Sequence, residues 1–184
     1  MQVRRPPGLS SVTTAPTRSR PKRPGVLLVL VLVAALLAGL VVRTFVLRPL
    51  TVSSTSMEPT LCPGDRVLVN LWDPDIRDLA RDDLVALRPG RSEVPVVKRV
   101  VGLPGDEVAI RDALLYVNDQ LVDEPYVDHK SIDSLFYGPV VVPADRFLVL
   151  GDARASSIDS RDYGPVPADR LLGRIALRLP VGEC

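Results

Sequence analysis

The feature that most constrains how this chain can fold is an uncharged apolar run at residues 26–42, built from Val, Leu, Ala and one Gly. With Phe45, Val46 and Leu47 beyond Arg43, the run reaches the ~20 residues that a helix needs to cross ~30 Å of hydrocarbon. We therefore predict a transmembrane helix over residues 26–47. A cleaved signal peptide is the competing interpretation, and the bulky Leu-Arg-Pro-Leu sequence at 47–50 argues against it.

Charge is distributed unevenly about this run. Residues 1–50 contain eight basic residues and no acidic one, and six of the eight precede the run. The remainder holds 15 basic and 22 acidic residues. Because positive charge stays on the cytoplasmic side of a membrane, we expect a cytoplasmic N-terminus and an extracytoplasmic domain over 48–184. Residues 1–25, rich in Pro, Ser, Thr and Arg, are predicted to be disordered, and the acidic remainder argues against nucleic-acid binding.

Beyond residue 50 the segments are short, rich in Val and Leu, and separated by Pro-Gly and Gly-Asp turns. This pattern predicts an antiparallel, mostly β domain. A single helical turn is expected within 75–83. The expected strands are residues 66–70, 84–87, 94–101, 107–110, 114–117, 140–142, 146–150 and a closing strand at 171–179.

The two cysteines, Cys62 and Cys184, belong to no Cys/His cluster, so no structural metal site is predicted. A disulfide between them requires an extracytoplasmic domain. The sequence leaves the pairing open, and two unpaired thiols is the simpler interpretation.

A serine lies in the run Ser54-Thr55-Ser56-Met57-Glu58-Pro59-Thr60. Taken alone, a Ser/Thr run indicates a linker or turn. An apolar Met beside Ser56 and a Pro two residues later are more typical of a fixed loop beneath an apolar cleft. A serine hydroxyl becomes a good nucleophile only when a neighbouring base takes its proton.

Lys98 is the candidate base. On a strand it shares a face with Val96 and Val100, and burial among valines would lower its pKa toward the working pH of a general base. The alternative is an ion-paired lysine on an edge strand. Because His129 is the chain's one histidine, a serine–lysine pair is more natural than a serine–histidine pair.

A third segment, residues 151–161, reads Gly-Asp-Ala-Arg-Ala-Ser-Ser-Ile-Asp-Ser-Arg. By itself it is a polar loop with charge pairs. Its hydroxyl, carboxylate and guanidinium groups suit a loop that positions a catalytic group through hydrogen bonds.

Taken in order, these segments resemble bacterial type I signal peptidase, a family of serine–lysine membrane proteases. The matching motifs are Ser-x-Ser-Met-x-Pro-Thr at 54–60, Gly-Asp-x-Val at 64–67, Lys-Arg-Val-Val-Gly-x-Pro-Gly-Asp at 98–106, and the segment 151–161. The resemblance implies that Ser56 is the nucleophile and Lys98 the general base. It further implies that Ser54 contributes to the oxyanion hole, that Ser157 orients the lysine amine, and that Asp152 with Arg99 and Asp159 with Arg161 form structural ion pairs.

The resemblance also implies a fold, a substrate and a location. The fold is an all-β catalytic domain of coiled antiparallel sheets, of the kind that signal peptidases share with self-cleaving repressors, with one N-terminal transmembrane helix in the bacterial cell membrane. A short second β subdomain is expected at about 107–145. The substrates are signal peptides of exported preproteins, cut after a small-x-small pattern such as Ala-x-Ala. No cofactor is implied, and we expect a monomer associated with the lipid bilayer. Residues expected to line the substrate pockets are Leu50, Val52, Met57, Leu61 and Val97.

One departure from the family pattern is Ala153, where Asn is common; it affects the loop around the dyad and not the dyad. Two alternative functions stay open. One is a dedicated maturation protease for one exported protein, and the other is a membrane-anchored binding module that has lost catalysis. Intact Ser56 and Lys98 disfavour the second.

Overall fold

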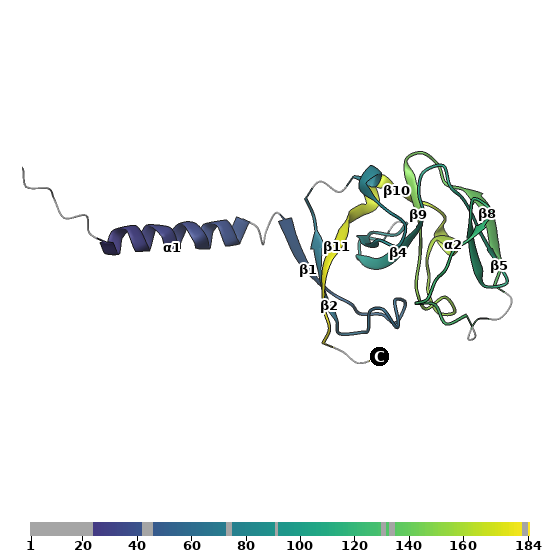
Figure 1. Cartoon of the computed structure of the whole chain (residues 1–184), viewed down its shortest axis with the longest axis horizontal. Helices are drawn as coiled ribbons and strands as arrows, with labels where there is room; N and C mark the ends of the chain where they lie inside the picture. The colour runs from purple at the N-terminus through teal and green to yellow at the C-terminus, as the bar shows by residue number, and fades with distance from the viewer. Residues whose placement is uncertain are drawn as a thin grey trace, which may run out of the picture. The chain divides into compact units, whose positions relative to one another are not determined.

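The protein is described here from a computed structural model covering residues 24–41, 46–72, 75–90, 92–129, 132, 135–181 and 184. It divides into two compact units, residues 1–37 and 38–184. The described residues of the first unit, 24–37, belong to helix α1 (Pro24–Val41; Figure 1). It begins at a proline, whose missing N–H costs nothing in the first turn of a helix, and its Leu and Val side chains are exposed.

Two sequence expectations change at this helix. Pro24 and Gly25 were predicted to be disordered and instead belong to α1, while residues 1–23 lie outside the described part of the chain. Leu47 was expected at the end of the transmembrane helix but begins strand β1, where it pairs with Asn70. Judged on length and hydropathy together, the described helices include no candidate for a membrane span.

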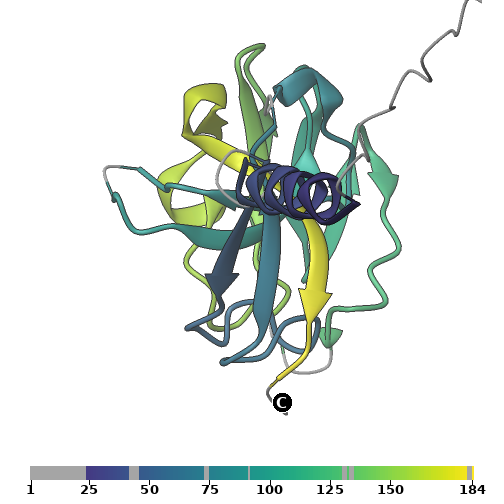
Figure 2. The same cartoon turned by 90° about the vertical axis from the view of Figure 1, so that its left-hand side faces the viewer.

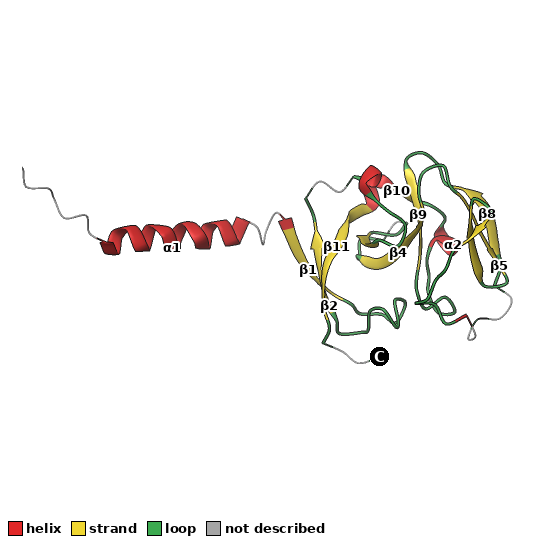
Figure 3. Ribbon diagram, viewed as in Figure 1, coloured by secondary structure: helices red, strands yellow, loops and turns green. Residues whose placement is uncertain are grey.

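The second unit is built mainly from antiparallel strands, in agreement with the predicted β class (Figure 3). Its larger sheet has seven strands in the order β1-β2-β11-β3-β4-β9-β10. Figures 1 and 2 show this sheet curling around the domain core. The strands are β1 (Leu47–Thr51), β2 (Arg66–Asn70), β3 (Leu84–Leu87), β4 (Val96–Gly102), β9 (Arg146–Leu150), β10 (Val166–Pro167) and β11 (Leu171–Leu179).

A smaller sheet lies on the far side of β9 from β11 (Figure 1). Its four strands run in the order β7-β6-β5-β8. Short helical segments complete the described part of the domain. The strands are β5 (Glu107–Arg111), β6 (Leu114–Val117), β7 (Gln120–Leu121) and β8 (Tyr137–Val141), and the helical segments are η2 (Ile76–Asp78), α2 (Ser160–Tyr163) and η4 (Ala168–Arg170).

The strand predictions agree closely with the structure. The predicted segments 66–70, 84–87, 114–117, 146–150 and 171–179 match β2, β3, β6, β9 and β11. The remaining predicted strands differ by one to three residues at an end. Three strands, β1, β7 and β10, and the helix α2 were not predicted. Two of these strands have only two residues each, and β1 contains Pro49, so none shows a readable alternation.

Bulges bend the larger sheet. The register of β11 shifts between Leu171 and Gly173 against β3, and again between Ile175 and Leu177 against β2. At Gly173 the backbone φ is 155°, and a Cβ there would overlap the carbonyl oxygen of Asn70. Only glycine lets the two backbones approach so closely, so Gly173 allows β11 to pair with both β2 and β3.

A disulfide joins Cys62 to Cys184 across 122 residues, with 5.3 Å between their Cα atoms. The simpler interpretation of two unpaired thiols was therefore wrong. Buried Asp65 reinforces this closure, because its carboxylate accepts hydrogen bonds from the N–H groups of Cys62 and Val181 and from Arg178. The pairing needed tertiary structure to be seen, since nothing local in the sequence brings residues 62 and 184 together.

Candidate active site

Ser56 lies in the loop that connects β1 to β2, here called the nucleophile loop (residues 52–65). The loop is closed at its base, where Val52 N–H donates to Asp65 O and Gly64 N–H donates to Val52 O, both at 2.8 Å. Within it, the Ser54 and Ser56 hydroxyl oxygens lie 3.2 Å apart. The hairpin between β1 and β2 therefore holds the serine in a fixed position, which argues against the flexible-linker interpretation.

Lys98 lies on β4, an interior strand of the larger sheet, and not on an edge. Only 3% of the residue is exposed. Its Nζ donates to Ser157 Oγ at 2.9 Å. Burial lowers the pKa of Lys98 to about 8, because removing the ammonium from water is costly, while the nearby Asp159 carboxylate opposes that shift. Among the ion pairs of the described residues none involves Lys98, so the edge-strand, ion-paired alternative does not hold.

Ser56 and the Lys98–Ser157 pair meet at Gly151. A Cβ at Gly151 would overlap Ser157 Oγ and lie 2.5 Å from the carbonyl oxygen of Ser56. The next residue but one, Ala153, donates its N–H to that same oxygen at 3.2 Å. Within the described residues no hydrogen bond joins Ser56 directly to Lys98; the contacts of the two side chains are with Ser54 and Ser157.

The segment 151–161, here called the support loop, is held by two ion pairs. Arg99 Nη2 lies 2.6 Å from Asp152 Oδ2, and Arg161 Nε lies 2.8 Å from Asp159 Oδ1. Asp159 has no exposed surface, accepts the Gly151 N–H and caps helix α2. The Arg161 guanidinium and the Gly151 N–H together hold the pKa of Asp159 below its usual value despite burial.

Arg99 also connects the support loop to the nucleophile loop. Its Nη2 donates to Thr60 Oγ1 at 3.2 Å, four residues after Ser56. The guanidinium lies 3.7 Å from the centre of the Tyr126 ring, a cation–π contact that sequence reasoning missed. One arginine thus ties β4 to three separate segments of the site.

A second missed feature is the ion pair between Arg154 and Glu124, in which both side chains are fully buried. Arg154 also donates to Gly151 O at 3.0 Å. Glu124 follows β7 of the smaller sheet, so this pair anchors the support loop to that sheet. No sequence signal marks Glu124, because an acidic residue in a polar loop is ordinarily solvated.

The five residues expected to line substrate pockets lie together in one apolar cluster. Val52, Met57, Leu61 and Val97 are buried, and Leu50 packs against them partly buried. Beside the cluster is a cavity of about 20 Å³, lined in part by Leu50, Val52, Met57 and Val97 and by Ser54. Leu61 is buried beneath and does not line the cavity. The cavity has room for a group of about methyl size.

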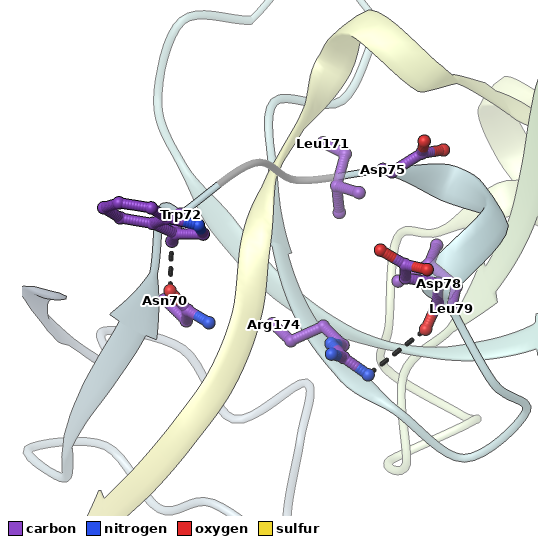
Figure 4. Close-up of a pocket in the computed structure, with 7 residues that line it drawn as sticks. All are labelled: Asn70, Trp72, Asp75, Asp78, Leu79, Leu171 and Arg174. Carbon is purple, nitrogen blue, oxygen red and sulfur yellow. Dashed lines mark hydrogen bonds between the residues drawn. The ribbon is translucent and has the colours of Figure 1, made fainter. Parts of the chain in front are cut away.

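A hollow of about 340 Å³ lies elsewhere, between the ends of β2 and β11 and the turn η2 (Figure 4). Trp72 stands at its rim, 70% exposed, and its backbone N–H donates to Asn70 Oδ1. Arg174 reaches across to the carbonyl oxygen of Asp78. Neither Ser56, Lys98 nor any other expected site residue lines this hollow, so it is separate from the candidate active site.

A mostly β domain in which a buried lysine of lowered pKa bonds to Ser157, close to the loop that carries Ser56, is compatible with the class of serine peptidases. Comparison with known proteins narrows this class. Residues 26–179 match the family model described as signal peptidase, peptidase S26, and the chain belongs to that family.

Several curated relatives share this assignment. The chain is 39% identical over 153 residues to "Probable signal peptidase I-2" of Synechocystis, covering 80% of this chain and 69% of that protein. It is 38% identical over 151 residues to "Signal peptidase I T" of Bacillus subtilis, covering 77% and 78%. It is 32% identical over 154 residues to "Signal peptidase IB" of Staphylococcus aureus, covering 75% and 80%. These similarities show that the chain is a serine peptidase of the signal peptidase I type.

A solved structure of a signal peptidase I from Enterococcus faecalis covers 54% of this chain and 97% of its own, at 29% identity and a TM-score of 0.49.

Proposed function

We propose that this protein removes signal peptides from exported preproteins by cleaving after a small-x-small sequence, with Ser56 as nucleophile and Lys98 as general base. The observation that carries the proposal is the buried Lys98 amine, bonded to Ser157 and lowered in pKa to about 8. A neutral amine can accept a proton, whereas an ordinary exposed lysine near neutral pH cannot.

In the first half of the reaction, Lys98 Nζ takes the proton of Ser56 Oγ as that oxygen attacks the scissile carbonyl carbon. For this the Ser56 side chain must turn from Ser54 toward Lys98, since its present contact is with Ser54 Oγ. Such hydrogen bonds often form only once substrate is bound. Ser157 Oγ holds the amine in position by accepting a hydrogen bond from it.

Charge develops on the carbonyl oxygen as Ser56 attacks. The Ser56 N–H and the Ser54 hydroxyl, whose oxygen is 3.2 Å from Ser56 Oγ, are suited to donate hydrogen bonds to that oxygen. The tetrahedral intermediate then collapses, and the Lys98 ammonium returns its proton to the departing amine. A water molecule, deprotonated by the again neutral Lys98, attacks the acyl–serine ester; the released Ser56 alkoxide takes back the proton, freeing the signal peptide carboxylate.

Selectivity for small residues before the cleaved bond follows from the cavity beside the nucleophile loop. Its volume of about 20 Å³ accommodates an alanine methyl and rejects larger side chains by overlap. The surrounding Val52, Met57 and Val97 offer no partner for a charged side chain. Substrate in an extended conformation would lie between residues 50–54 and the Pro95–Val97 segment.

Membrane attachment forms part of this proposal. Its support is the uncharged apolar run 26–42 behind a basic, acid-free leader. Such an anchor would hold Ser56 close to the outer face of the membrane, because Ser56 lies fourteen positions past the end of the uncharged run. Signal peptides are themselves apolar segments delivered from the bilayer, so an active site near its surface meets them directly.

The catalytic assignment is tested by replacing Ser56 and Lys98. We expect Ser56→Ala and Lys98→Ala each to abolish cleavage of a preprotein with an Ala-x-Ala site while the circular dichroism spectrum stays that of the wild type. The double variant should be little worse than either single one, because the two residues act as a unit. Substantial turnover by either single variant would exclude the dyad, and cleavage of one preprotein alone among many would favour a dedicated protease.

The orientation is tested separately on intact spheroplasts. Protease added outside should digest the domain that carries Ser56 and spare a tag placed before residue 26. Digestion of the tag with protection of the domain would reverse the proposed topology.

A further inference from the structure

A second hollow adjoins the active site, apart from the small cavity. It has a volume of about 380 Å³ and lies between the nucleophile loop and the support loop. Glu58 and Pro59 line it from the first loop, Ala153, Ala155 and Ser156 from the second, and Cys184 from the segment after β11. Neither the sequence motifs nor the proposed chemistry gives this hollow a role.

The hollow is lined by neighbours of the residues that hold both reacting groups. Ala153, in its wall, donates its N–H to the carbonyl oxygen of Ser56. Ser156, also in its wall, precedes Ser157, which holds the Lys98 amine. The small apolar cavity is instead formed by residues before Ser56 and by Met57, with Pro95 and Val97. The two spaces therefore share the nucleophile loop, which lines the small cavity up to Met57 and the second hollow with Glu58 and Pro59.

A peptide bound for cleavage has to extend beyond Ser56 in both directions. Each residue of an extended peptide advances ~3.3 Å, so the second and third residues after the cleaved bond lie outside the small cavity. The second hollow is bounded by the same nucleophile loop and is large enough for side chains that the small cavity rejects.

Charge around the hollow is unbalanced. Its cationic member, Arg154, is already paired with Glu124, and its Asp152 is paired with Arg99. Glu58 is partly buried, and among the described residues no cation pairs with its carboxylate. A bound acidic side chain would therefore meet repulsion, and a basic one attraction.

We propose that this hollow receives the first residues of the mature protein, on the carboxyl side of the cleaved bond, and that Glu58 makes the enzyme discriminate against acidic residues there. The inference rests on the proposed function, because it assigns a binding place to the part of the same substrate that follows the cleaved bond.

The test uses peptides that share one Ala-x-Ala signal sequence and differ only after the cleaved bond. Lys or Glu is placed in turn at the first, second or third position beyond it, and kcat/KM is measured with the full-length protein in detergent. At one or more positions we expect the Lys peptide to be cleaved about three- to tenfold better than the Glu peptide at low salt, with the ratio shrinking as salt screens the charge.

Glu58→Gln removes the charge while keeping the shape, and should bring the Lys-to-Glu ratio at that position close to one. Glu107→Gln is the matched control, since Glu107 lies on β5 and lines neither space; it should keep the wild-type ratio. Melting curves establish that both variants are folded.

A second variant tests the location without charge. Ala155→Trp fills the exposed lip of the hollow, and should slow peptides with large residues after the bond more than peptides with Gly there. The inference would be overturned if the Lys and Glu peptides were cleaved at equal rates at all three positions, or if Glu58→Gln left their ratio unchanged. In either case cleavage of the peptides would still support the proposed function. Failure of the wild type to cut any peptide would overturn both.

Discussion

At the scale of single residues, the site depends on a lysine whose burial is unusual. Lys98 is 3% exposed, and its amine donates a hydrogen bond to the Ser157 hydroxyl. No carboxylate forms an ion pair with it within the described residues, and Asp159, the nearest counter-charge in effect, is occupied by Arg161 and the Gly151 N–H. Asp152 and Asp159 thus form ion pairs with Arg99 and Arg161 and not with Lys98, so little opposes the loss of the lysine proton.

The pH dependence of cleavage follows from this arrangement. Desolvation places the pKa of Lys98 near 8, below its unfolded value of ~10.4. Because the base must be neutral, kcat/KM should rise about tenfold per pH unit below that pKa and level off above it. At pH 7 roughly a tenth of the enzyme carries a neutral amine.

The profile is measured with a peptide that has no ionisable side chain, between pH 6 and 10. A second profile for Ser157→Ala should show lower activity, because the amine is no longer aimed. A rate that does not change across this range would contradict Lys98 as the base.

At the scale of secondary-structure elements, three consecutive side chains of β4 contact three different parts of the site. Val97 joins the apolar cluster under the small cavity, Lys98 reaches Ser157, and Arg99 reaches Asp152. Since β3 and β9 flank β4 on both sides, these directions are fixed by the sheet. The support loop is fixed in turn by the Asp159 cap of α2.

Gly151 is where these elements approach most closely, so we expect Gly151→Ala to impair catalysis strongly. A Cβ would displace Ser157 Oγ and the Ser56 carbonyl, separating the base from the nucleophile. A displacement of about 1 Å in such a site can cost on the order of 10² in rate. The measurement is kcat of the purified variant at a temperature well below its melting point.

Gly164→Ala provides the control for a backbone effect. Gly164 ends α2 with φ of 77° and has nothing within 4 Å of its would-be Cβ. That variant should lose about 1 kcal/mol from strain and keep its turnover number. Equal kcat losses in the two variants would mean that the close packing at Gly151 has no catalytic role.

At the scale of the whole domain, stability depends on its apolar clusters, two of which are larger cores, and on one long-range covalent link. One core packs the face of the larger sheet around Phe147 and Val100, and the other joins β9 to the smaller sheet through Leu148 and Leu150. The Cys62–Cys184 disulfide then ties the segment after β11 to the nucleophile loop. Asp65 strengthens that tie by bonding both segments.

Removing the disulfide should destabilise the domain. A link that closes 122 residues restricts the unfolded chain and is typically worth a few kcal/mol. For a protein of this size that corresponds to a fall of roughly 5–12 °C in Tm. Cys184→Ser should show it in calorimetry, and dithiothreitol should have the same effect on the wild type.

Cys62→Ser should match Cys184→Ser, and neither variant should respond further to reductant. A wild type whose Tm does not change under full reduction would indicate that the link contributes nothing to stability.

Much of the protein was determined by sequence alone, because its strands are local patterns bounded by Pro-Gly and Gly-Asp turns. Five of the predicted strands agree with the structure at both ends. The Ser56 and Lys98 motifs identified the family, since serine–lysine chemistry needs a nucleophile and a base in recognisable surroundings. The five apolar residues expected to line substrate pockets also lie together, although their role in binding stays a prediction.

Only the tertiary structure decided what depends on distant segments meeting. The disulfide, the buried Arg154–Glu124 pair and the stacking of Arg99 on Tyr126 each join residues 27 or more positions apart. The close approach of Gly151 to both Ser56 and Ser157 is of the same kind. Burial turns an ordinary acid or lysine into a structural or catalytic one, and burial is a property of the packed domain that no local stretch of sequence contains.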